Sequence, residues 1–372
     1  MALNIWTGFH WCSPVNANNN AMAEESLQKT GRWGATILMY NGNNPNDPTR
    51  LYANQDFADA CDQVMNAREA VNGGRSLDQC VARLWFGQPL TINSPGQPNN
   101  IASVSDADNW LRTNGYYDSL NYFVSNHGQL CVVFNELNQP SEPQYNIDPR
   151  IMGYLGFALQ NAYWINYPTN PRLLFTLFPG PTGLLGSQGA FDNYFQANYG
   201  NTGIGYDLWH NGSGYLSFGQ WATDHGVSVD STIANRTMLY HGGSGVYDRI
   251  ALHCYASTEA QFQDSTIANN PALQYVQWFQ QVDSSEWVYV TEASGSQSYD
   301  DYNEGVALAW FEYNVSNLNA QSISSGGFGG QVQAVYGYIL DITNPGASRN
   351  GIDRFSCHAT DGYNAERQDL GF

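Results

Sequence analysis

The sequence contains a single lysine, Lys29, and only 14 basic residues in all against 33 acidic ones, which gives a formal net charge of −19. A chain of this charge repels phosphate backbones and anionic lipid headgroups, so we expect neither a nucleic acid nor a membrane as its partner. The chain also lacks any uninterrupted apolar run of the roughly 18 residues that a membrane-spanning helix requires. These absences favour a globular protein whose partner carries little charge.

The motifs of several enzyme classes are also missing. The seven histidines include no pair with the spacing of metal ligands, and the six cysteines include no CxxC pair, so no zinc site is indicated. Residues 242–245 approach the GxSxG pattern, but they precede a predicted strand, whereas a nucleophile elbow follows one. No glycine-rich phosphate loop follows the first predicted strand, residues 4–10. We therefore expect no metal and no cofactor.

The composition favours a carbohydrate partner. Charged residues make up only 13% of the chain, whereas aromatic residues make up 14% and include 11 Trp and 24 Tyr. Neutral polar groups beside flat aromatic rings suit sugars, because the C–H face of a sugar stacks on an aromatic ring while its hydroxyls form hydrogen bonds. The same composition also fits secreted proteins of other kinds.

Residues 1–11 lack the basic segment and the long apolar segment of a signal peptide. We expect a secreted monomer given in its mature form, and a cytoplasmic location is the alternative. The six cysteines permit three disulfide bonds. Cys61 and Cys80 are the favoured pair, because they lie at the end of a predicted helix and the start of the next strand. Cys131 and Cys254 lie in apolar runs and are predicted to be buried thiols.

Short apolar runs alternate along the chain with longer stretches of helical periodicity. The predicted strands are residues 4–10, 35–40, 80–86, 130–134, 173–178, 249–255, 287–291 and 333–340. The predicted helices are residues 21–30, 55–71, 106–126 with a cap at Ser105, 149–165, 271–282 and 302–319. The pattern predicts one α/β domain over residues 1–372, a (β/α)8 TIM barrel with an elaborated loop region between strands 5 and 6. That loop region, residues 179–245, is the predicted source of substrate specificity.

Two glutamates stand at the ends of apolar strands. Glu136 follows the fourth strand, after Asn135, and Glu292 follows the seventh. A carboxylate is costly to bury without a partner, and an ion pair with Arg83 is the purely structural explanation for either glutamate. The carboxyl ends of all eight strands form the active face of a barrel, so the two glutamates together indicate a catalytic pair.

These motifs resemble those of the retaining (β/α)8 glycosidases of the 4/7 superfamily, which includes cellulases, mannanases, xylanases and β-galactosidases. Residues 133–138 are similar to the acid/base motif of that clan, and residues 288–292 are similar to its nucleophile strand. Residues 253–255 resemble the His-x-Tyr motif at the end of strand six. The tryptophan that ends strand eight in several of its families is missing, and Tyr336, Tyr338 and Asp341 occupy that region.

The resemblance implies hydrolysis of β-glycosidic bonds by double displacement, with Glu292 as nucleophile and Glu136 as general acid/base. In this mechanism Glu136 needs a raised pKa, which its apolar strand and the charge of Glu292 are expected to supply. Arg83 and Tyr255 are expected to keep Glu292 ionised. Asn135 is expected to bind the sugar hydroxyl beside the reacting carbon, and the further predicted substrate-binding residues are His10, Trp11, Trp85, His253 and Tyr338. The aromatic loops favour endo action on a polysaccharide or oligosaccharide, and a non-catalytic carbohydrate-binding barrel is the alternative.

Overall fold

The computed structural model describes residues 3–11, 33–40, 42–44, 47–52, 54–137, 142–145, 147–166, 172–177, 222–223, 226–234, 246–247, 249–282, 287–295, 301–337 and 357–371. Among the helices in these ranges, none has the length and apolar character that crossing a bilayer would take.

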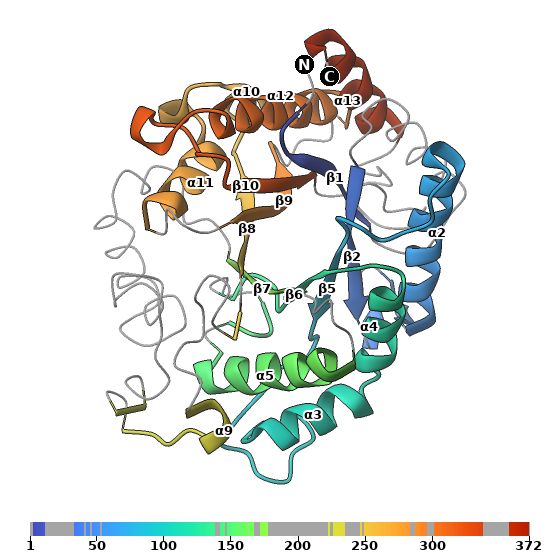
Figure 1. Ribbon diagram of the computed structural model, residues 1–372, viewed down its shortest axis with the longest axis vertical. Coiled ribbons are helices and arrows are strands. Elements are labelled where there is room, and N and C mark those ends of the chain that lie inside the picture. The colour runs from blue at the N-terminus through green and yellow to red at the C-terminus, as the bar shows by residue number, and fades with distance from the viewer. Residues whose placement is uncertain are drawn as a thin grey trace.

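Eight parallel strands close into a barrel in the order β1-β10-β9-β8-β7-β6-β5-β2 (Figure 1). The strands are β1 (Trp6–Trp11), β2 (Trp33–Tyr40), β5 (Val81–Trp85), β6 (Leu130–Val133), β7 (Arg172–Leu177), β8 (Arg249–Tyr255), β9 (Val288–Ser294) and β10 (Val332–Gly337). Each strand coincides with one of the predicted runs, and β10 closes the ring by pairing with β1. The prediction of a (β/α)8 barrel is confirmed.

Helices surround the barrel on its outer side (Figure 1). The longer ones are α2 (Asn54–Asn72), α3 (Val104–Thr113), α4 (Tyr116–Ser125), α5 (Pro149–Asn166), α11 (Pro271–Val282), α12 (Asp301–Asn319) and α13 (Cys357–Leu370). The shorter elements are the antiparallel pair β3 (Gly42–Asn44) and β4 (Asp47–Tyr52), the helices α9 (Ser231–Ala234) and α10 (Glu259–Gln263), and the 3₁₀ turns η1 (Ile267–Asn269) and η2 (Ile323–Ser325). The sequence did not predict α13 or these shorter elements.

The helix predicted over residues 106–126 is wrong in two respects. The structure has two helices there, because Gly115 between α3 and α4 takes a left-handed φ of 76° that breaks the helical path. The cap is Ser103 rather than Ser105, and the Ser103 hydroxyl accepts a hydrogen bond from the Asp106 N–H at 3.1 Å.

Two of the predicted features lie largely or wholly outside the described residues. The predicted helix at residues 21–30 is one of them. The loop region predicted over residues 179–245 is the other, since only residues 222–223 and 226–234 within it are described. The role of this loop region in substrate specificity stays a prediction. The organisation of residues 1–372 as a single domain also stays a prediction.

Alternate residues of each strand pack on opposite sides of the barrel wall. Leu130 and Val132 of β6 belong to a cluster made by strand residues alone, which fills the barrel interior. Cys131 and Val133 face the other way and join the large core beneath the helices. On β5 the same alternation turns Arg83 to the interior side. Arg83 therefore points into the barrel near the carboxyl end of β5.

The predicted disulfide between Cys61 and Cys80 is wrong. Both residues are free thiols and fully buried in the layer between α2 and the barrel. Burial raises the pKa of both thiols, so they act there as small apolar side chains. Cys131 and Cys254 are likewise buried free thiols, as predicted.

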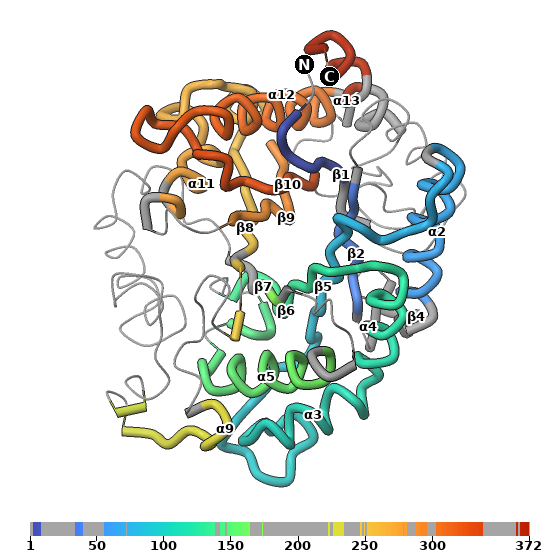
Figure 2. The backbone as a smooth tube through the Cα atoms, viewed as in Figure 1, coloured from blue at the N-terminus to red at the C-terminus, as the bar shows by residue number. Residues whose placement is uncertain are grey.

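A buried polar cluster ties α13 to the barrel. The Arg367 guanidinium donates to Glu312 Oε2 of α12 at 2.7 Å and to Thr7 Oγ1 of β1 at 3.0 Å. The Tyr363 hydroxyl donates to Glu312 Oε2 at 2.7 Å. These bonds hold the C-terminal helix beside α12 and near the start of β1 (Figure 2).

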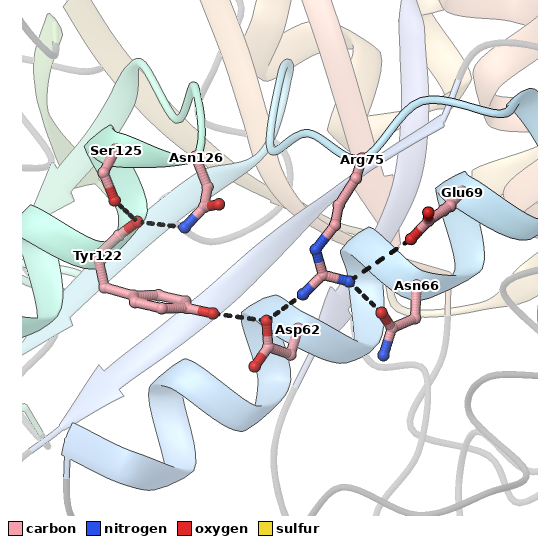
Figure 3. Close-up of polar contacts among 7 residues, drawn as sticks. All are labelled: Asp62, Asn66, Glu69, Arg75, Tyr122, Ser125 and Asn126. Carbon is pink, nitrogen blue, oxygen red and sulfur yellow. Dashed lines mark hydrogen bonds and ion pairs between the residues drawn. The ribbon is translucent and has the colours of Figure 1, made fainter.

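A second polar cluster lies on the outer surface between α2 and α4 (Figure 3). Arg75 contacts Asp62 at 2.5 Å and Glu69 at 3.9 Å, and the Tyr122 hydroxyl donates to Asp62 at 2.5 Å. The side chain of Glu69 is 59% exposed. Because exposed ion pairs contribute little to stability, Glu69 offers a reference position for removing a charge without consequence.

Candidate active site

Seven polar side chains lie at or just beyond the carboxyl ends of four strands: Arg83 and Trp85 on β5, Asn135 and Glu136 in the turn after β6, His253 and Tyr255 on β8, and Glu292 on β9. His253 stands opposite Glu292 in the register of β8 and β9, just after an irregularity in that register. The sequence predicted all seven of these residues as site residues, and the structure brings them to the same edge of the barrel.

The chain turns sharply where it leaves β6. Phe134 and Glu136 have φ values of 75° and 40°, which residues other than glycine rarely adopt. Phe134 is held by a hydrogen bond from its N–H to the Leu84 carbonyl at 3.0 Å and by edge-on packing of its ring on Phe86. Strained backbone of this kind persists where the surroundings fix it, and it is common at functional sites.

The two glutamates approach each other closely. One carboxylate oxygen of Glu136, one of Glu292 and a ring nitrogen of His253 all lie within 4.8 Å of one another. Carboxyl groups about 5–5.5 Å apart are typical of retaining glycosidases, whereas inverting enzymes separate them by roughly 6.5–9.5 Å to admit a water molecule. An oxygen-to-oxygen distance of at most 4.8 Å makes this a close pair of carboxyls.

Glu292 is held by one ion pair and one hydrogen bond. Its side chain forms an ion pair with Arg83 Nη1, accepts a hydrogen bond from the Tyr255 hydroxyl, and lies 3.2 Å from His253 Nδ1. Glu292 is only 4% exposed. Burying a carboxylate is tolerated when its oxygens are paired with a charge and with a hydrogen-bond donor, and Arg83 and Tyr255 supply these two partners.

Glu136 has the opposite environment. It is 9% exposed, and burial raises the pKa of its carboxyl from 4.5 to about 7, although the charge of Arg83 opposes the rise. Its Oε1 lies 2.6 Å from His253 Nδ1. The two neighbouring carboxyls therefore have contrasting environments, as do the carboxyl pairs of enzymes that use one of the two as an acid.

His253 is neutral in this site, because burial lowers the pKa of its imidazole to about 3. The three atoms shared by His253, Glu136 and Glu292 have a spacing that a metal ion could use. A metal-bound histidine normally donates its other ring N–H to a partner, but Nε2 of His253 is buried and has none among the described residues. The guanidinium of Arg83 against Glu292 also repels a cation, so the arrangement fits a hydrogen-bonded carboxyl pair better than a metal site.

Asn135 is oriented by its neighbours. Its Oδ1 accepts a hydrogen bond from Arg83 Nη2 at 2.6 Å, so its amide nitrogen faces away from the guanidinium. Trp85 donates from its indole Nε1 to Glu142 Oε2 at 3.0 Å. Sequence reasoning missed Glu142, which stands in the segment between β6 and α5. Glu142 does not stand at a strand end, and nothing in the sequence around it indicates a contact with Trp85 on β5.

The side chains of three predicted substrate-binding residues lie outside the described part of the chain. His10 and Trp11 end β1, but only their backbone lies within the described residues. Tyr338 follows β10 and lies outside them.

The sequence matches no protein-family model and none of the curated proteins compared with it. Solved structures, in contrast, are similar to it in fold. A rice β-glucosidase variant in a covalent complex with glucose aligns with 94% of this chain and 87% of its own, at a TM-score of 0.52 and 9% identity. A fungal β-1,4-galactanase aligns with 97% of this chain and 99% of its own, at a TM-score of 0.50 and 11% identity. The chain therefore has the (β/α)8 fold of these β-glycosidases.

Proposed function

We propose that this protein is a retaining glycoside hydrolase that cleaves β-glycosidic bonds, with Glu292 as nucleophile and Glu136 as general acid/base. The observation that carries the proposal is a close pair of carboxyls in opposite environments. Arg83 and Tyr255 engage the Glu292 carboxylate, whereas burial raises the pKa of Glu136 to about 7. Structural similarity to a β-glucosidase and a β-1,4-galactanase supports the same reaction class.

The reaction proceeds in two displacements. In the first, the Glu292 carboxylate attacks the anomeric carbon and forms an ester, while the glycosidic C–O bond breaks and Glu136 transfers its proton to the leaving oxygen. In the second, water attacks the anomeric carbon, its proton passes to Glu136, and the ester bond to Glu292 breaks. Each carboxyl ends the cycle in its starting protonation state.

Arg83 and Asn135 assist this reaction in different ways. Arg83 forms an ion pair with Glu292, the proposed nucleophile. Asn135, with its amide oxygen engaged by Arg83, directs its nitrogen as a donor to the sugar hydroxyl beside the anomeric carbon. Hydrogen bonds to that hydroxyl strengthen as positive charge develops on the sugar ring.

The proposal includes endo action on a polymer by a secreted enzyme. The chain between β7 and β8 spans residues 178–248 and is rich in aromatic and neutral polar residues, including Trp209, Trp221, Tyr206 and Tyr215. A long insertion of this composition between two barrel strands suits a cleft for several sugar units. The β-1,4-galactanase among the structural neighbours takes its name from a polymeric substrate.

A panel of β-linked polysaccharides and nitrophenyl glycosides tests the proposal. We expect wild-type protein to release reducing ends from at least one member, and Glu136→Gln and Glu292→Gln each to lower kcat by several orders of magnitude. Glu69→Gln removes the same kind of charge from the exposed cluster and should leave turnover unchanged. Binding of a sugar polymer without turnover by the wild type would instead support the carbohydrate-binding barrel.

A further inference from the structure

The segment that carries Glu142 is held by hydrogen bonds against the loop after β5. The buried amide of Gln144 donates to the carbonyls of Phe86 at 3.2 Å and Gln88 at 2.6 Å, and its oxygen accepts the Leu90 N–H at 3.2 Å. Turn hydrogen bonds from the Tyr145 N–H to the Glu142 carbonyl and from the Ile147 N–H to the Gln144 carbonyl shape the segment itself. Gln144 therefore anchors the segment, and the Glu142 side chain is left for another task.

The Glu142 carboxylate bridges two side chains of the proposed active site. Its Oε2 accepts the indole N–H of Trp85 at 3.0 Å, and the carboxylate also forms a side-chain hydrogen bond with Asn135. Trp85 ends β5 and Asn135 follows β6, so Glu142 joins the ends of two neighbouring strands. Burial raises the pKa of Glu142, while its two donors and the charge of Arg83 oppose that rise.

These contacts fix which way round the Asn135 amide lies. Arg83 Nη2 requires the amide oxygen on its side, and the Glu142 carboxylate requires the amide nitrogen on the other. A flipped amide would place its NH₂ against the guanidinium and its oxygen against the carboxylate, losing two charge-assisted hydrogen bonds. The amide nitrogen carries two N–H groups, and Glu142 engages one of them.

We propose that Glu142 is a positioning residue that makes Asn135 an obligate donor to the sugar hydroxyl beside the anomeric carbon and holds the indole of Trp85 in place at the edge of the same site. This inference rests on the proposed glycosidase function. Glu142 itself does not touch the reacting atoms: its partners are Trp85 and Asn135, and it acts through them. The substrate class that follows is a glycoside with a free hydroxyl next to the anomeric carbon.

Paired substrates separate this role from a merely structural one. The glycoside that the wild type cleaves is compared with its analogue that lacks the neighbouring hydroxyl. We expect Glu142→Ala to lower kcat/KM roughly 10- to 100-fold on the hydroxylated glycoside, the range of one hydrogen bond to a charged group. On the deoxy analogue, and in an Asn135→Ala background, the further loss should be clearly smaller, because only the hydrogen bond to Trp85 is then left to lose.

Two matched variants complete the kinetic series. Glu142→Gln keeps the size and one acceptor oxygen, so we expect a loss between those of wild type and Glu142→Ala. Glu69→Gln, in the exposed cluster of Figure 3, should be indistinguishable from wild type on both substrates. An equal loss for Glu142→Ala on both glycosides, or losses that add fully to those of Asn135→Ala, would overturn the inference.

If no glycoside is cleaved, the proposed function is refuted. The role of Glu142 can still be tested by a measurement that needs no turnover. In protein labelled with ¹⁵N-tryptophan, the Trp85 indole resonance is identified by its disappearance in Trp85→Phe. We expect this resonance to shift in Glu142→Ala and to stay in place in Glu69→Gln, because the indole N–H loses its charged acceptor only in the former. An unchanged Trp85 resonance in Glu142→Ala would show that Glu142 does not position the indole.

Discussion

Replacing Glu136 tests how its environment shapes the reaction. Burial moves the pKa of Glu136 from 4.5 to about 7. At pH 6 a carboxyl with a pKa of 7 is about 90% protonated, whereas one with a pKa of 4.5 is about 3% protonated, so burial supplies about 30-fold more of the acid form. We expect the kcat/KM of the wild type to fall about tenfold for each pH unit above about 7.

In Glu136→Gln this alkaline limb should vanish, and the remaining activity should depend steeply on how well the leaving group departs. Stopped-flow assays on nitrophenyl and dinitrophenyl glycosides between pH 5 and pH 9 measure both effects. With the dinitrophenyl glycoside, whose departure needs no proton, the variant should still show a rapid burst followed by slow hydrolysis. An alkaline limb that persists near pH 7 in Glu136→Gln would refute the assignment of Glu136 as the acid.

The same raised pKa has a consequence for stability with a defined sign. The folded-state pKa of Glu136 lies above its ordinary value of 4.5. The contribution of protonated Glu136 to the free energy of unfolding is therefore fully present below about pH 4.5 and is lost as the pH rises through about 7. The cost of ionisation is on the order of 3 kcal/mol for a shift of this size. Urea unfolding should therefore show Glu136→Gln gaining stability relative to wild type between pH 5 and pH 8, and a constant difference would contradict the reasoning.

Two further substitutions test the surroundings of the site and the closure of the fold. Tyr255→Phe removes the hydroxyl that donates to Glu292, and we expect kcat/KM to fall roughly 10- to 150-fold with the circular dichroism spectrum unchanged; wild-type kinetics would exclude a role for this bond. Arg367→Met leaves Glu312 buried without its counter-charge, and denaturant unfolding should show a loss of about 3–5 kcal/mol. Adding Glu312→Leu to Arg367→Met should recover part of that loss, and simple additivity of the two changes would contradict the ion-pair explanation.

The barrel could be predicted from the sequence because its signals are local. Runs apolar on both faces, such as residues 130–133, predict strands buried beneath helices, and the order of eight such runs predicts a closed sheet. The break at Gly115 was missed because residues 106–126 keep an apolar periodicity across it, and only the left-handed φ of that glycine ends the first helix. The helix α13 was missed because its attachment depends on Arg367 and Glu312, which are 55 residues apart in the chain.

The proposed site was predictable only in part, because some of its residues are positioned by contacts that are not local in the sequence. Glu136 and Glu292 stand at strand ends, so the topology of a barrel places them at one edge. Glu142 was not predictable, because its position depends on Gln144 bonding to the backbone of residues 86–90. The disulfide between Cys61 and Cys80 was predicted from position along the chain, whereas the structure buries both as free thiols.

The anomeric configuration of the first product formed is the most direct test of the proposed mechanism. Proton NMR during hydrolysis of a β-glycoside distinguishes the two anomers before mutarotation mixes them. Carboxyls as close as those of Glu136 and Glu292, whose nearest oxygens lie within 4.8 Å, predict that the β-anomer appears first. Initial release of the α-anomer would show that water attacks directly and would contradict the assignment of Glu292 as nucleophile.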